Sequence, residues 1–337
     1  MYQTPYHNED LSNYAFLVTG GAGFIGSNLV EYLLKYGAGK VRVLDNLSTG
    51  IYKNIAEFKD HPSFEFIEGD IRDPETCRKA CENIDYVSHQ AALGSVPRSI
   101  NDPLTTNEVN VSGFLNMLIA VKDSRVKRMV YAASSSTYGD SKELPKMEDR
   151  IGKPLSPYAV TKYVNELYAD VFAKTFGTES IGLRYFNVFG PKQDPNGAYA
   201  AVIPLFMKAL QDSEPAKLNG DGTQTRDFTF IENVVQANVK AMLLSEHPAH
   251  SIFNIACGQR ISLIELWNVL KEISGTDPGT VFNPVRAGDI QDSLADISRA
   301  STELGYNPEF DFRQGMEITY HWFMDDPKIS TIKINNG

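Results

Sequence analysis

Two side chains able to form an acid–base pair stand four residues apart in the segment SPYAVTK, residues 156–162. Tyr158 and Lys162 belong to a stretch with helical periodicity, so both project from one face of the predicted helix. A phenol that accepts protons near neutral pH needs a pKa about three units below its usual value of about 10. A lysine ammonium a few ångström away can supply an interaction of that order. The spacing also fits a surface pair on an amphipathic helix, and it points to catalysis only if the chain binds a dinucleotide.

Three serines follow the apolar run of residues 128–133. The hydroxyl groups of Ser134, Ser135 and Ser136 could orient a substrate hydroxyl beside the Tyr158 phenol, or they could simply end a strand. This serine segment and the Tyr–Lys segment together are the candidate reaction centre.

A glycine-rich turn near the N-terminus is the candidate dinucleotide site. A β-type run at residues 16–19 leads directly into Gly20-x-x-Gly23-x-x-Gly26 and then into an amphipathic helix through about residue 36. In such a strand–turn–helix unit, backbone N–H groups and the helix dipole can hold a pyrophosphate. A second apolar strand ends at Asp45, whose carboxylate can accept the ribose hydroxyls of NAD and repel the extra phosphate of NADP. Asp45 could also be an ordinary turn residue; the polar loop after it contains Asn46, Ser48 and Thr49.

Strands alternate with helical segments through the first half of the chain. Further β-type runs cover residues 64–71, 85–92, 128–133 and 180–185, and a long helical pattern covers residues 103–121. This alternation predicts an α/β fold with a doubly wound parallel sheet covered on both faces. Such sheets bind ligands at the carboxyl ends of their strands. The residues predicted at that edge are Gly20 to Gly26, Asp45, Asp70, Gln90, Ala91, Ala92 and Ser134.

The pattern becomes irregular after about residue 190, where Pro, Gly and Asp become more frequent. This change predicts a smaller C-terminal α/β lobe over residues 191–330, beside a cofactor domain at residues 15–190 with later returns of the chain and an N-terminal tail at residues 1–14. Arg226 and Arg286 in this lobe are candidates for holding a diphosphate, because guanidinium groups match phosphate geometry. Two structural Arg–Asp pairs, with Asp227 and Asp289, explain these arginines equally well.

Composition excludes several classes of function. The 337 residues carry a net charge of -10 without a basic cluster, which argues against nucleic acid as the main partner. The first fourteen residues lack the apolar core of a secretory signal, and no apolar run approaches the roughly 18 residues needed to span a membrane. We therefore expect a soluble, cytoplasmic protein. Cys77, Cys81 and Cys257 fit a reducing compartment, and their surroundings in the sequence predict no metal site.

With these features in order, the chain resembles an extended short-chain dehydrogenase/reductase from about residue 15 to about residue 322. Within that family it resembles the UDP-hexose 4-epimerases, and more narrowly those that act on the N-acetylated sugars UDP-GlcNAc and UDP-GalNAc. The motifs that carry the resemblance are TGGAGFIG at residues 19–26, LDNLSTG at 44–50, EGDIRD at 68–73, SSSTYGD at 134–140, SPYAVTK at 156–162, LRYFNVFGP at 183–191 and NGDGTQTRDF at 219–228.

The resemblance implies a Rossmann domain with tightly bound NAD, no metal, and a reaction centre of Ser134, Tyr158 and Lys162. The residues it implies for NAD are Gly20, Gly23, Phe24, Ile25, Gly26, Asp45, Asn46, Ser48, Thr49, Gly50, Asp70, Ile71, Gln90, Ala91, Ala92, Asn110, Tyr158, Lys162 and Tyr185. Those it implies for the UDP-sugar are Ser95, Arg98, Ser134, Ser135, Ser136, Tyr158, Asn187, Val202, Asn219, Arg226, Arg286, Asp289 and Ser293.

One position bears on the choice of sugar. Galactose epimerases resembling this chain have a bulky Tyr four residues after the Asp of an Arg-x-x-Asp motif, where this chain has Ser293. A serine leaves room for a 2-acetamido group at the sugar C2, and the loop at residues 94–99 also resembles that of the N-acetylhexosamine epimerases. Ser293 could instead face solvent. Related dehydratases carry an Asp-Glu pair where this chain has Ser135 and Ser136, which argues against elimination of water.

The implied activity is reversible C4 epimerisation of UDP-GlcNAc and UDP-GalNAc through a 4-keto sugar, which would serve polysaccharide biosynthesis. The family also implies a homodimer formed through the helices at residues 103–121 and 158–174. Two enzyme alternatives stay open, the plain UDP-glucose reaction and the reactions of UDP-glucuronate. A non-catalytic NAD-binding protein on the same fold is the alternative from another class, although such proteins usually lack the Tyr or the Lys.

Overall fold

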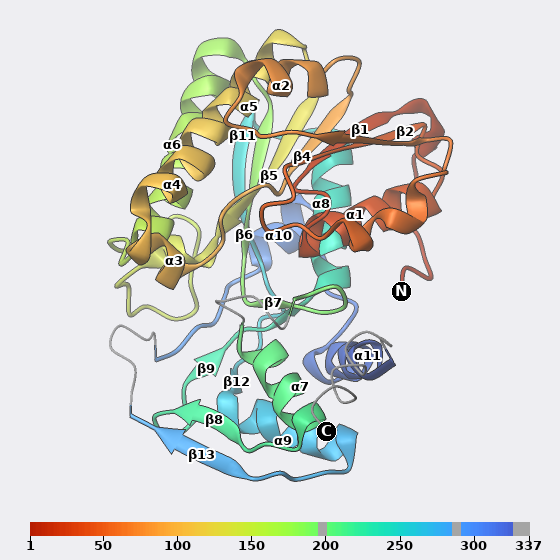
Figure 1. The fold of residues 1–337 in the computed structure, drawn as a ribbon. Helices are drawn as coiled ribbons and strands as arrows, with labels where there is room; N and C mark the ends of the chain where they lie inside the picture. Colours follow the sequence, from red (N-terminus) through yellow and green to blue (C-terminus); the bar gives the residue numbers. More distant parts are fainter. Residues whose placement is uncertain (195–200, 285–290, 326–337) are drawn as a thin grey trace.

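A seven-stranded parallel sheet forms the larger part of the molecule, as the computed structural model shows for residues 1–194, 201–284 and 291–325 (Figure 1). Its strands run in the order β11-β6-β5-β4-β1-β2-β3. The bounds are β1 (Ala15–Thr19), β2 (Lys40–Asp45), β3 (Phe64–Glu68), β4 (Tyr86–His89), β5 (Arg128–Ser134), β6 (Ser180–Tyr185) and β11 (His250–Ile255). The predicted doubly wound parallel sheet is confirmed, with β11 as a seventh strand beyond the six that the sequence predicted.

Helices cover both faces of this sheet, because successive apolar side chains of each strand point to opposite faces and both faces must be buried. In β1, Phe16 and Val18 pack in the cluster shared with α1 (Phe24–Lys35) and α8 (Ile231–Leu243). Leu17, between them, points to the opposite face. That face is covered by α2 (Pro74–Ala80), α5 (Phe114–Asp123) and α6 (Pro157–Phe176) (Figure 1).

Helix α6 carries the predicted Tyr–Lys pair, and its ends have clear causes. Ser156 caps the N-terminus by accepting a hydrogen bond from the Ala159 N–H, and Pro157 begins the first turn. Gly177 ends the helix in the left-handed conformation, with φ of 68°. The twenty residues between these caps place Tyr158 and Lys162 in the first two turns, directly beside the end of β5.

The long helix predicted at residues 103–121 is interrupted. It consists of α4 (Pro103–Asn107), a π-helical turn η4 (Glu108–Gly113) and α5. Asn110 in the π-helical turn accepts from the Leu93 N–H at 2.8 Å and donates to the Leu93 carbonyl at 3.2 Å. The turn therefore fastens the loop that follows β4 to the helical layer, a local role often seen for π-bulges near functional sites.

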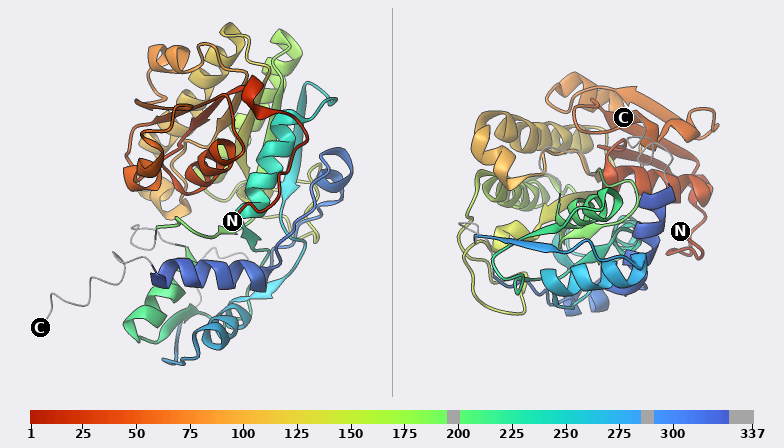
Figure 2. Two further views of the ribbon diagram at one scale, coloured as in Figure 1. Left: turned by 90° about the vertical axis from the view of Figure 1, so that its right-hand side faces the viewer. Right: turned by 60° about the horizontal axis from the view of Figure 1, so that its bottom comes forward.

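A smaller lobe lies beyond the carboxyl ends of the strands, at the bottom of Figure 1 and in the left view of Figure 2. It contains α7 (Val202–Asp212), α9 (Leu263–Ser274) and α11 (Phe312–Asp325) with short strand pairs. The pairs are β8 (Ala216–Asn219) with β13 (Thr280–Asn283), β9 (Thr225–Arg226) with β12 (Ile261–Ser262), and β7 (Val188–Phe189) with β10 (Thr229–Phe230). Two short α-helices of six residues each complete the α-helices described, α3 (Val96–Asn101) and α10 (Ser298–Glu303).

The first residues of the chain pack onto the sheet domain. Tyr2 and Tyr6 are buried, and both interact with Glu232 at the start of α8: the Tyr2 N–H donates at 2.6 Å and the Tyr6 hydroxyl at 2.9 Å. The Tyr2 hydroxyl also bonds the Asn28 side chain of α1 at 3.0 Å. The segment predicted as a tail thus includes side chains that belong to the core.

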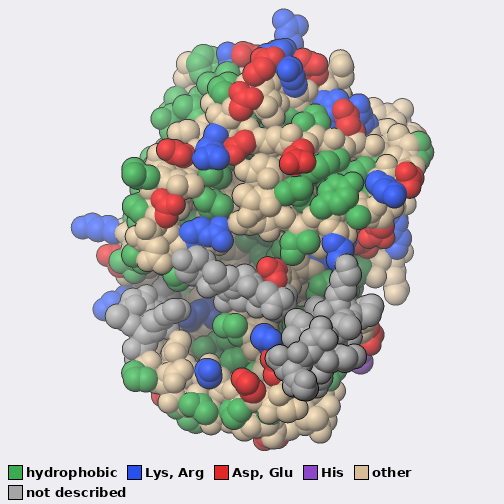
Figure 3. Space-filling model, viewed as in Figure 1, with side chains coloured by type: hydrophobic (Ala, Val, Ile, Leu, Met, Phe, Trp, Pro, Cys, Tyr) green, Lys and Arg blue, Asp and Glu red, His purple; other side chains and the backbone are tan. Residues whose placement is uncertain are grey.

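No helix within the described ranges combines the length and the apolar character needed to cross a bilayer. On the face drawn in Figure 3, acidic and basic side chains are interspersed among the coloured residues, without a large basic patch.

Candidate active site

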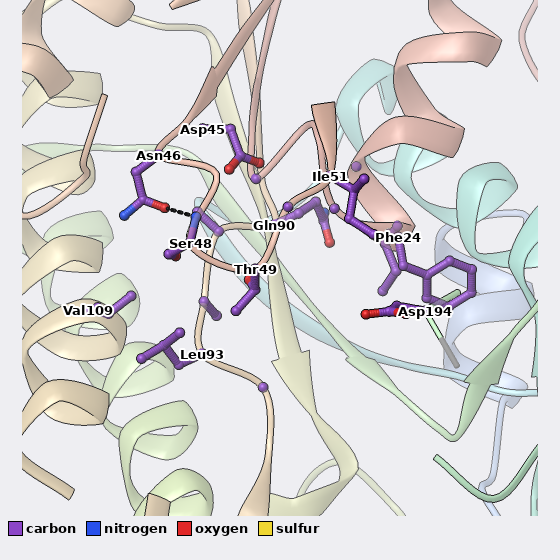
Figure 4. A pocket seen from close by; sticks show the side chains of 18 of the residues that line it. Phe24, Asp45, Asn46, Ser48, Thr49, Ile51, Gln90, Leu93, Val109 and Asp194 are labelled. Atoms are coloured by element: carbon purple, nitrogen blue, oxygen red, sulfur yellow. Dashed lines mark hydrogen bonds between the residues drawn. The ribbon is translucent and has the colours of Figure 1, made fainter. Parts of the chain in front are cut away.

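A cavity of about 740 Å³ lies at the carboxyl ends of β1, β2 and β4 (Figure 4). Its walls come from the glycine turn, the loops after β2, β3 and β4, and the segment after β6. The predicted residues that line it are Gly20, Gly23, Phe24, Ile25, Gly26, Asp45, Asn46, Ser48, Thr49, Gly50, Asp70, Ile71, Gln90, Ala91, Ala92, Ser95, Tyr158 and Asn187. The sheet therefore brings most of the predicted dinucleotide residues to one place.

The glycine turn provides a cradle that only glycine permits. Gly20 has φ of +67°, and a Cβ there would lie 2.7 Å from the Ala91 nitrogen. A Cβ on Gly26 would collide with the Gly20 carbonyl oxygen. Gly23 caps α1 without a side chain, so the N–H groups of the first turn are available to an anion at the helix N-terminus. The turn thus fits a pyrophosphate.

Asp45 is held at the end of β2 with only 7% of its surface exposed. Its carboxylate accepts from the Ala22 N–H at 3.0 Å and from the Leu47 N–H at 2.8 Å. Burial raises the pKa of Asp45, and these two hydrogen bonds act in the opposite direction. A carboxylate has about four lone-pair positions, so acceptor capacity remains for the two hydroxyls of a ribose.

The next strand end carries a second acidic group. Asp70 accepts from the Asn46 amide at 2.9 Å and pairs with Arg72 at 2.7 Å, and hydrogen bonds from Arg72 lower the pKa of Asp70 to about 2. Asn46 in turn accepts from the Ser48 N–H (Figure 4). These bonds hold the Asn46 loop against the Asp70 loop, and both line the cavity beside Asp45.

Gln90, at the floor of the cavity, is fixed by a buried polar network. Its amide donates to Ser88 Oγ at 2.9 Å and to Asn238 Oδ1 at 3.0 Å, and its carbonyl accepts from the Tyr185 hydroxyl at 3.3 Å. The Asn238 amide donates to the Tyr185 hydroxyl at 2.9 Å. Tyr185 therefore lies beneath the cavity wall and acts on it through Gln90. Asn238 was missed by the sequence analysis, since α8 carries other polar residues such as Asn233 and Gln236 and nothing in its sequence distinguishes Asn238 from them.

The predicted reaction centre is assembled where α6 meets the end of β5. Tyr158 faces the cavity, and the Ser134 side chain near it acts to lower the pKa of the phenol. Ser134 Oγ also accepts from Ser136 Oγ at 2.8 Å. Lys162 is 3% exposed, and its ammonium donates to the Ala132 carbonyl at 2.9 Å. The Lys162 nitrogen lies 5.9 Å from the centre of the Tyr158 ring.

The expected effect of Lys162 on Tyr158 needs a correction. Burial raises the pKa of Tyr158, and only the hydrogen bond from Ser134 acts to lower it. Burial also lowers the pKa of Lys162, to about 8. For each group the pKa shift caused by desolvation therefore outweighs the attraction that the spacing suggested. The protein alone does not lower the pKa of this phenol toward neutrality.

Other predicted residues surround this centre at greater distance. Asn110 lies behind the Leu93 loop and donates to Thr161 Oγ1 at 3.2 Å, and Arg98 lies in α3, whose N-terminus Ser95 caps. Ser135 begins the short helical turn after β5. The predicted site residues of the smaller lobe that do not line the cavity are Val202, Asn219, Arg226 and Ser293. Arg286 and Asp289 lie outside the described residues.

The cavity has lining residues that sequence reasoning did not assign. Leu93 and Val109 form one apolar side, and Ile51 forms another beside Phe24 (Figure 4). Lys192 and Asp194 follow β7, and the Lys192 ammonium pairs with Glu31 of α1 at 2.7 Å. The motif GPKQD was visible in the sequence, but nothing in its pattern indicates that the chain turns back toward the glycine loop.

Comparison with known proteins agrees with this geometry. Residues 16–256 match the model of the NAD dependent epimerase/dehydratase family. A putative UDP-glucose 4-epimerase of Methanocaldococcus jannaschii is 35% identical over 92% of this chain and 98% of its own.

Two solved structures are also similar. One is a UDP-N-acetylglucosamine 4-epimerase from Methanobrevibacter ruminantium in complex with UDP-N-acetylmuramic acid, with TM-score 0.88 and 36% identity over 92% of this chain and 98% of that chain. The other is a UDP-glucuronic acid 4-epimerase from Bacillus cereus in complex with UDP-glucuronic acid and NAD, with TM-score 0.85 and 32% identity over 92% and 99% of the two chains. The chain therefore belongs to the NAD dependent epimerase/dehydratase family, and NAD is its cofactor.

Proposed function

We propose that this protein interconverts UDP-GlcNAc and UDP-GalNAc by epimerisation at the sugar C4. The observation that carries the proposal is the position of Tyr158, which lines the cavity that fits NAD, with the Lys162 nitrogen 5.9 Å from its ring and Ser134 at the end of the neighbouring strand β5. A hydroxyl pair of this kind can bind and deprotonate a sugar hydroxyl beside the cofactor. The comparison proteins named as 4-epimerases of UDP-sugars support the class of reaction.

Each residue of the centre has a distinct task in this proposal. Ser134 holds the 4-hydroxyl, and Tyr158 takes its proton and later returns it. Lys162 supplies a positive charge, which favours the ionised phenol once the site is filled. NAD supplies the reversible acceptance of a hydride from C4 and the positive charge of its nicotinamide ring. The 4-keto sugar must then turn to present its other face, so the nucleotide has to be held more firmly than the sugar.

The residues proposed to hold NAD are the glycine turn for the pyrophosphate, Asp45 for the adenosine ribose, and Asp70 with Ile71 beside the adenine. Those proposed for the UDP-sugar are Asn187 at the cavity wall and Arg226 in the smaller lobe. Arg98, Val202 and Asn219 are proposed to complete the nucleotide site, and so are Arg286 and Asp289.

Preference for the N-acetylated sugar rests on two features of this chain. Small residues, including Gly94 and Ser95, line one side of the cavity. The resemblance of this chain to the galactose epimerases aligns Ser293 with a bulky Tyr of their sugar pocket, and a structurally similar protein is named a UDP-GlcNAc 4-epimerase. Epimerisation of UDP-glucuronate is the second candidate, since a protein of similar fold was solved with that substrate.

A homodimer through α4, α5 and α6 is part of the proposal. Val160, Leu167 and Val171 are 48%, 48% and 52% exposed and follow one another at helical spacing on α6. Leu104 of α4 is 77% exposed, and Ile119 of α5 is 42% exposed. Exposed apolar side chains on neighbouring helices are typical of a subunit interface, and α4 and α5 both pack against α6. Light scattering after size exclusion would give twice the mass of 37.5 kDa, and a monomer would contradict this part.

The test is a substrate panel followed by proton NMR. Purified protein is mixed with UDP-GlcNAc, UDP-glucose or UDP-glucuronate, first without and then with added NAD. Formation of UDP-GalNAc faster than either other product supports the proposal. Faster conversion of UDP-glucose or UDP-glucuronate would leave an epimerase with another substrate, and conversion of none would contradict the enzyme assignment.

A further inference from the structure

A fully buried carboxylate lies just beyond Arg226, in the smaller lobe. Asp227 is 0% exposed, and its carboxylate is bound by backbone groups of the described residues. Its oxygens accept backbone N–H groups from Cys257 at 3.0 Å, Gly258 at 3.1 Å and Ala295 at 3.2 Å. Burial raises its pKa to about 6, with these hydrogen bonds acting in the opposite direction. The charge is therefore stabilised by backbone dipoles from two distant segments.

One of these segments carries Ser293. We call residues 291–296 the strap. The Ser293 N–H donates to the Thr225 carbonyl at 3.1 Å, and the Thr225 N–H donates to the Gln291 carbonyl at 3.0 Å. The Thr225 hydroxyl donates to Asp292 at 2.6 Å. The Ala295 N–H then donates to the Asp227 carboxylate, so hydrogen bonds join the strap to the β9 segment along the length of the strap.

The backbone of Asp227 holds a second proposed substrate residue. Its carbonyl accepts from the Asn187 amide at 3.0 Å. Asn187 lines the cavity and has φ of 34°, a conformation that costs energy for a residue with a side chain. Asp227 is thus bonded to the strap through its side chain and to the cavity wall through its main chain, and it follows Arg226 directly in the sequence.

We infer that Asp227 is a positioning residue, which sets the strap with Ser293 and the adjoining Arg226 at the correct distance from the Asn187 wall of the cavity. It acts without touching substrate. A carboxylate suits this task because both of its oxygens accept hydrogen bonds. An amide has only one accepting oxygen, and its NH₂ group would face backbone N–H groups that need an acceptor. The inference rests on the proposed function for the identity of the ligand, UDP-sugar.

The test compares Asp227→Asn with the matched change Asp221→Asn. Asp221 is an exposed residue in the same lobe that caps its own turn by accepting from the Thr223 N–H at 3.0 Å. NAD-loaded proteins are titrated with UDP by calorimetry, and kcat and KM are measured for the best UDP-sugar. We expect Asp227→Asn to weaken UDP binding and raise KM by about tenfold, equivalent to about 1.4 kcal/mol. Its kcat should stay within about threefold of the parent, and it should retain bound NAD as Asp221→Asn does.

Each other outcome has a defined meaning. Unchanged UDP affinity in folded Asp227→Asn overturns the inference, and so does a fall in kcat at constant KM. If the parent protein binds UDP but converts no UDP-sugar, the proposed function fails, and weaker UDP binding in the variant still supports the positioning role. If the parent protein does not bind UDP, both fail.

Thr225→Val provides a second variant, because Asp227→Asn could prevent folding. It removes the hydroxyl bonded to Asp292 without uncovering a buried charge. The same rise in KM, smaller in size and with kcat retained, supports the inference, whereas parental KM in Thr225→Val overturns it.

Discussion

Replacing Lys162 with Met should make the fold more stable while it removes turnover. Lys162 is 3% exposed, and burial lowers its pKa from 10.5 to about 8. Each pKa unit corresponds to about 1.36 kcal/mol, so keeping this side chain charged in the folded protein costs on the order of 3 kcal/mol. Met has a similar length and no charge, but it loses the hydrogen bond to the Ala132 carbonyl, worth about 1 kcal/mol. The free energy of unfolding of Lys162→Met at pH 7 is therefore expected to exceed that of wild type by about 2 kcal/mol.

The sign of the pH dependence follows from the lowered pKa. Below pH 8 the lysine is protonated in both the folded and the unfolded protein, so the full cost of burying the charge is present. Between about pH 8 and pH 10.5 the folded lysine is neutral while the unfolded one still binds a proton, so wild-type stability rises with pH relative to the variant. The stability gap should narrow by about 2 kcal/mol between pH 7 and about pH 9.5.

Urea unfolding of NAD-free protein, followed by far-ultraviolet circular dichroism, measures both quantities. Lys174→Met on the same helix is the control, because its side chain is 73% exposed and pairs with Asp170 at 2.6 Å. The free energy of unfolding of that variant should differ from the wild-type value by less than about 0.5 kcal/mol at either pH. The reasoning is refuted if Lys162→Met is less stable than wild type at pH 7, or if its stability gap is the same at both pH values.

Three further substitutions test the site. Tyr158→Phe should lower kcat by about 10²–10⁴-fold, the usual contribution of an acid–base group, while bound NAD measured after denaturation stays stoichiometric; near-parental kcat would remove Tyr158 from the proposed role. Asp45→Asn should weaken NAD binding by about tenfold and reduce the preference for NAD over NADP, because the charge that repels the extra phosphate is lost. An equal loss of affinity for both dinucleotides in equilibrium titrations would argue against this role of Asp45. Ser293→Tyr should raise KM for UDP-GlcNAc by at least about tenfold and leave KM for UDP-glucose unchanged; parallel changes in steady-state assays would show that Ser293 does not border the C2 substituent.

The sequence predicted the part of the site that lies close to the strand ends. Each of Gly20, Asp45 and Gln90 follows an apolar run directly, and parallel strands bring such positions to one edge of the sheet. The Tyr158–Lys162 spacing likewise needs only the helical repeat. These are short-range patterns, and the structure places all these residues at or directly beside the cavity.

Features that depend on distant partners could not be predicted. Asp227 accepts from Gly258 and Ala295, which are 31 and 68 residues away along the chain, so its sequence neighbours reveal nothing of its role. The π-helical turn around Asn110 depends on the Leu93 loop, seventeen residues before it. The pKa of Tyr158 depends on how completely the site excludes water, which spacing along a helix does not determine.

The most direct test of the central claim is the fate of the hydrogen at C4. UDP-GlcNAc carrying deuterium at C4 is incubated with the purified protein in ordinary water, and the product is examined by NMR and mass spectrometry. The account predicts UDP-GalNAc that keeps its deuterium at C4, because the same hydride leaves and returns inside a closed site. Loss of the deuterium to solvent, or absence of UDP-GalNAc after NAD is supplied, would contradict it.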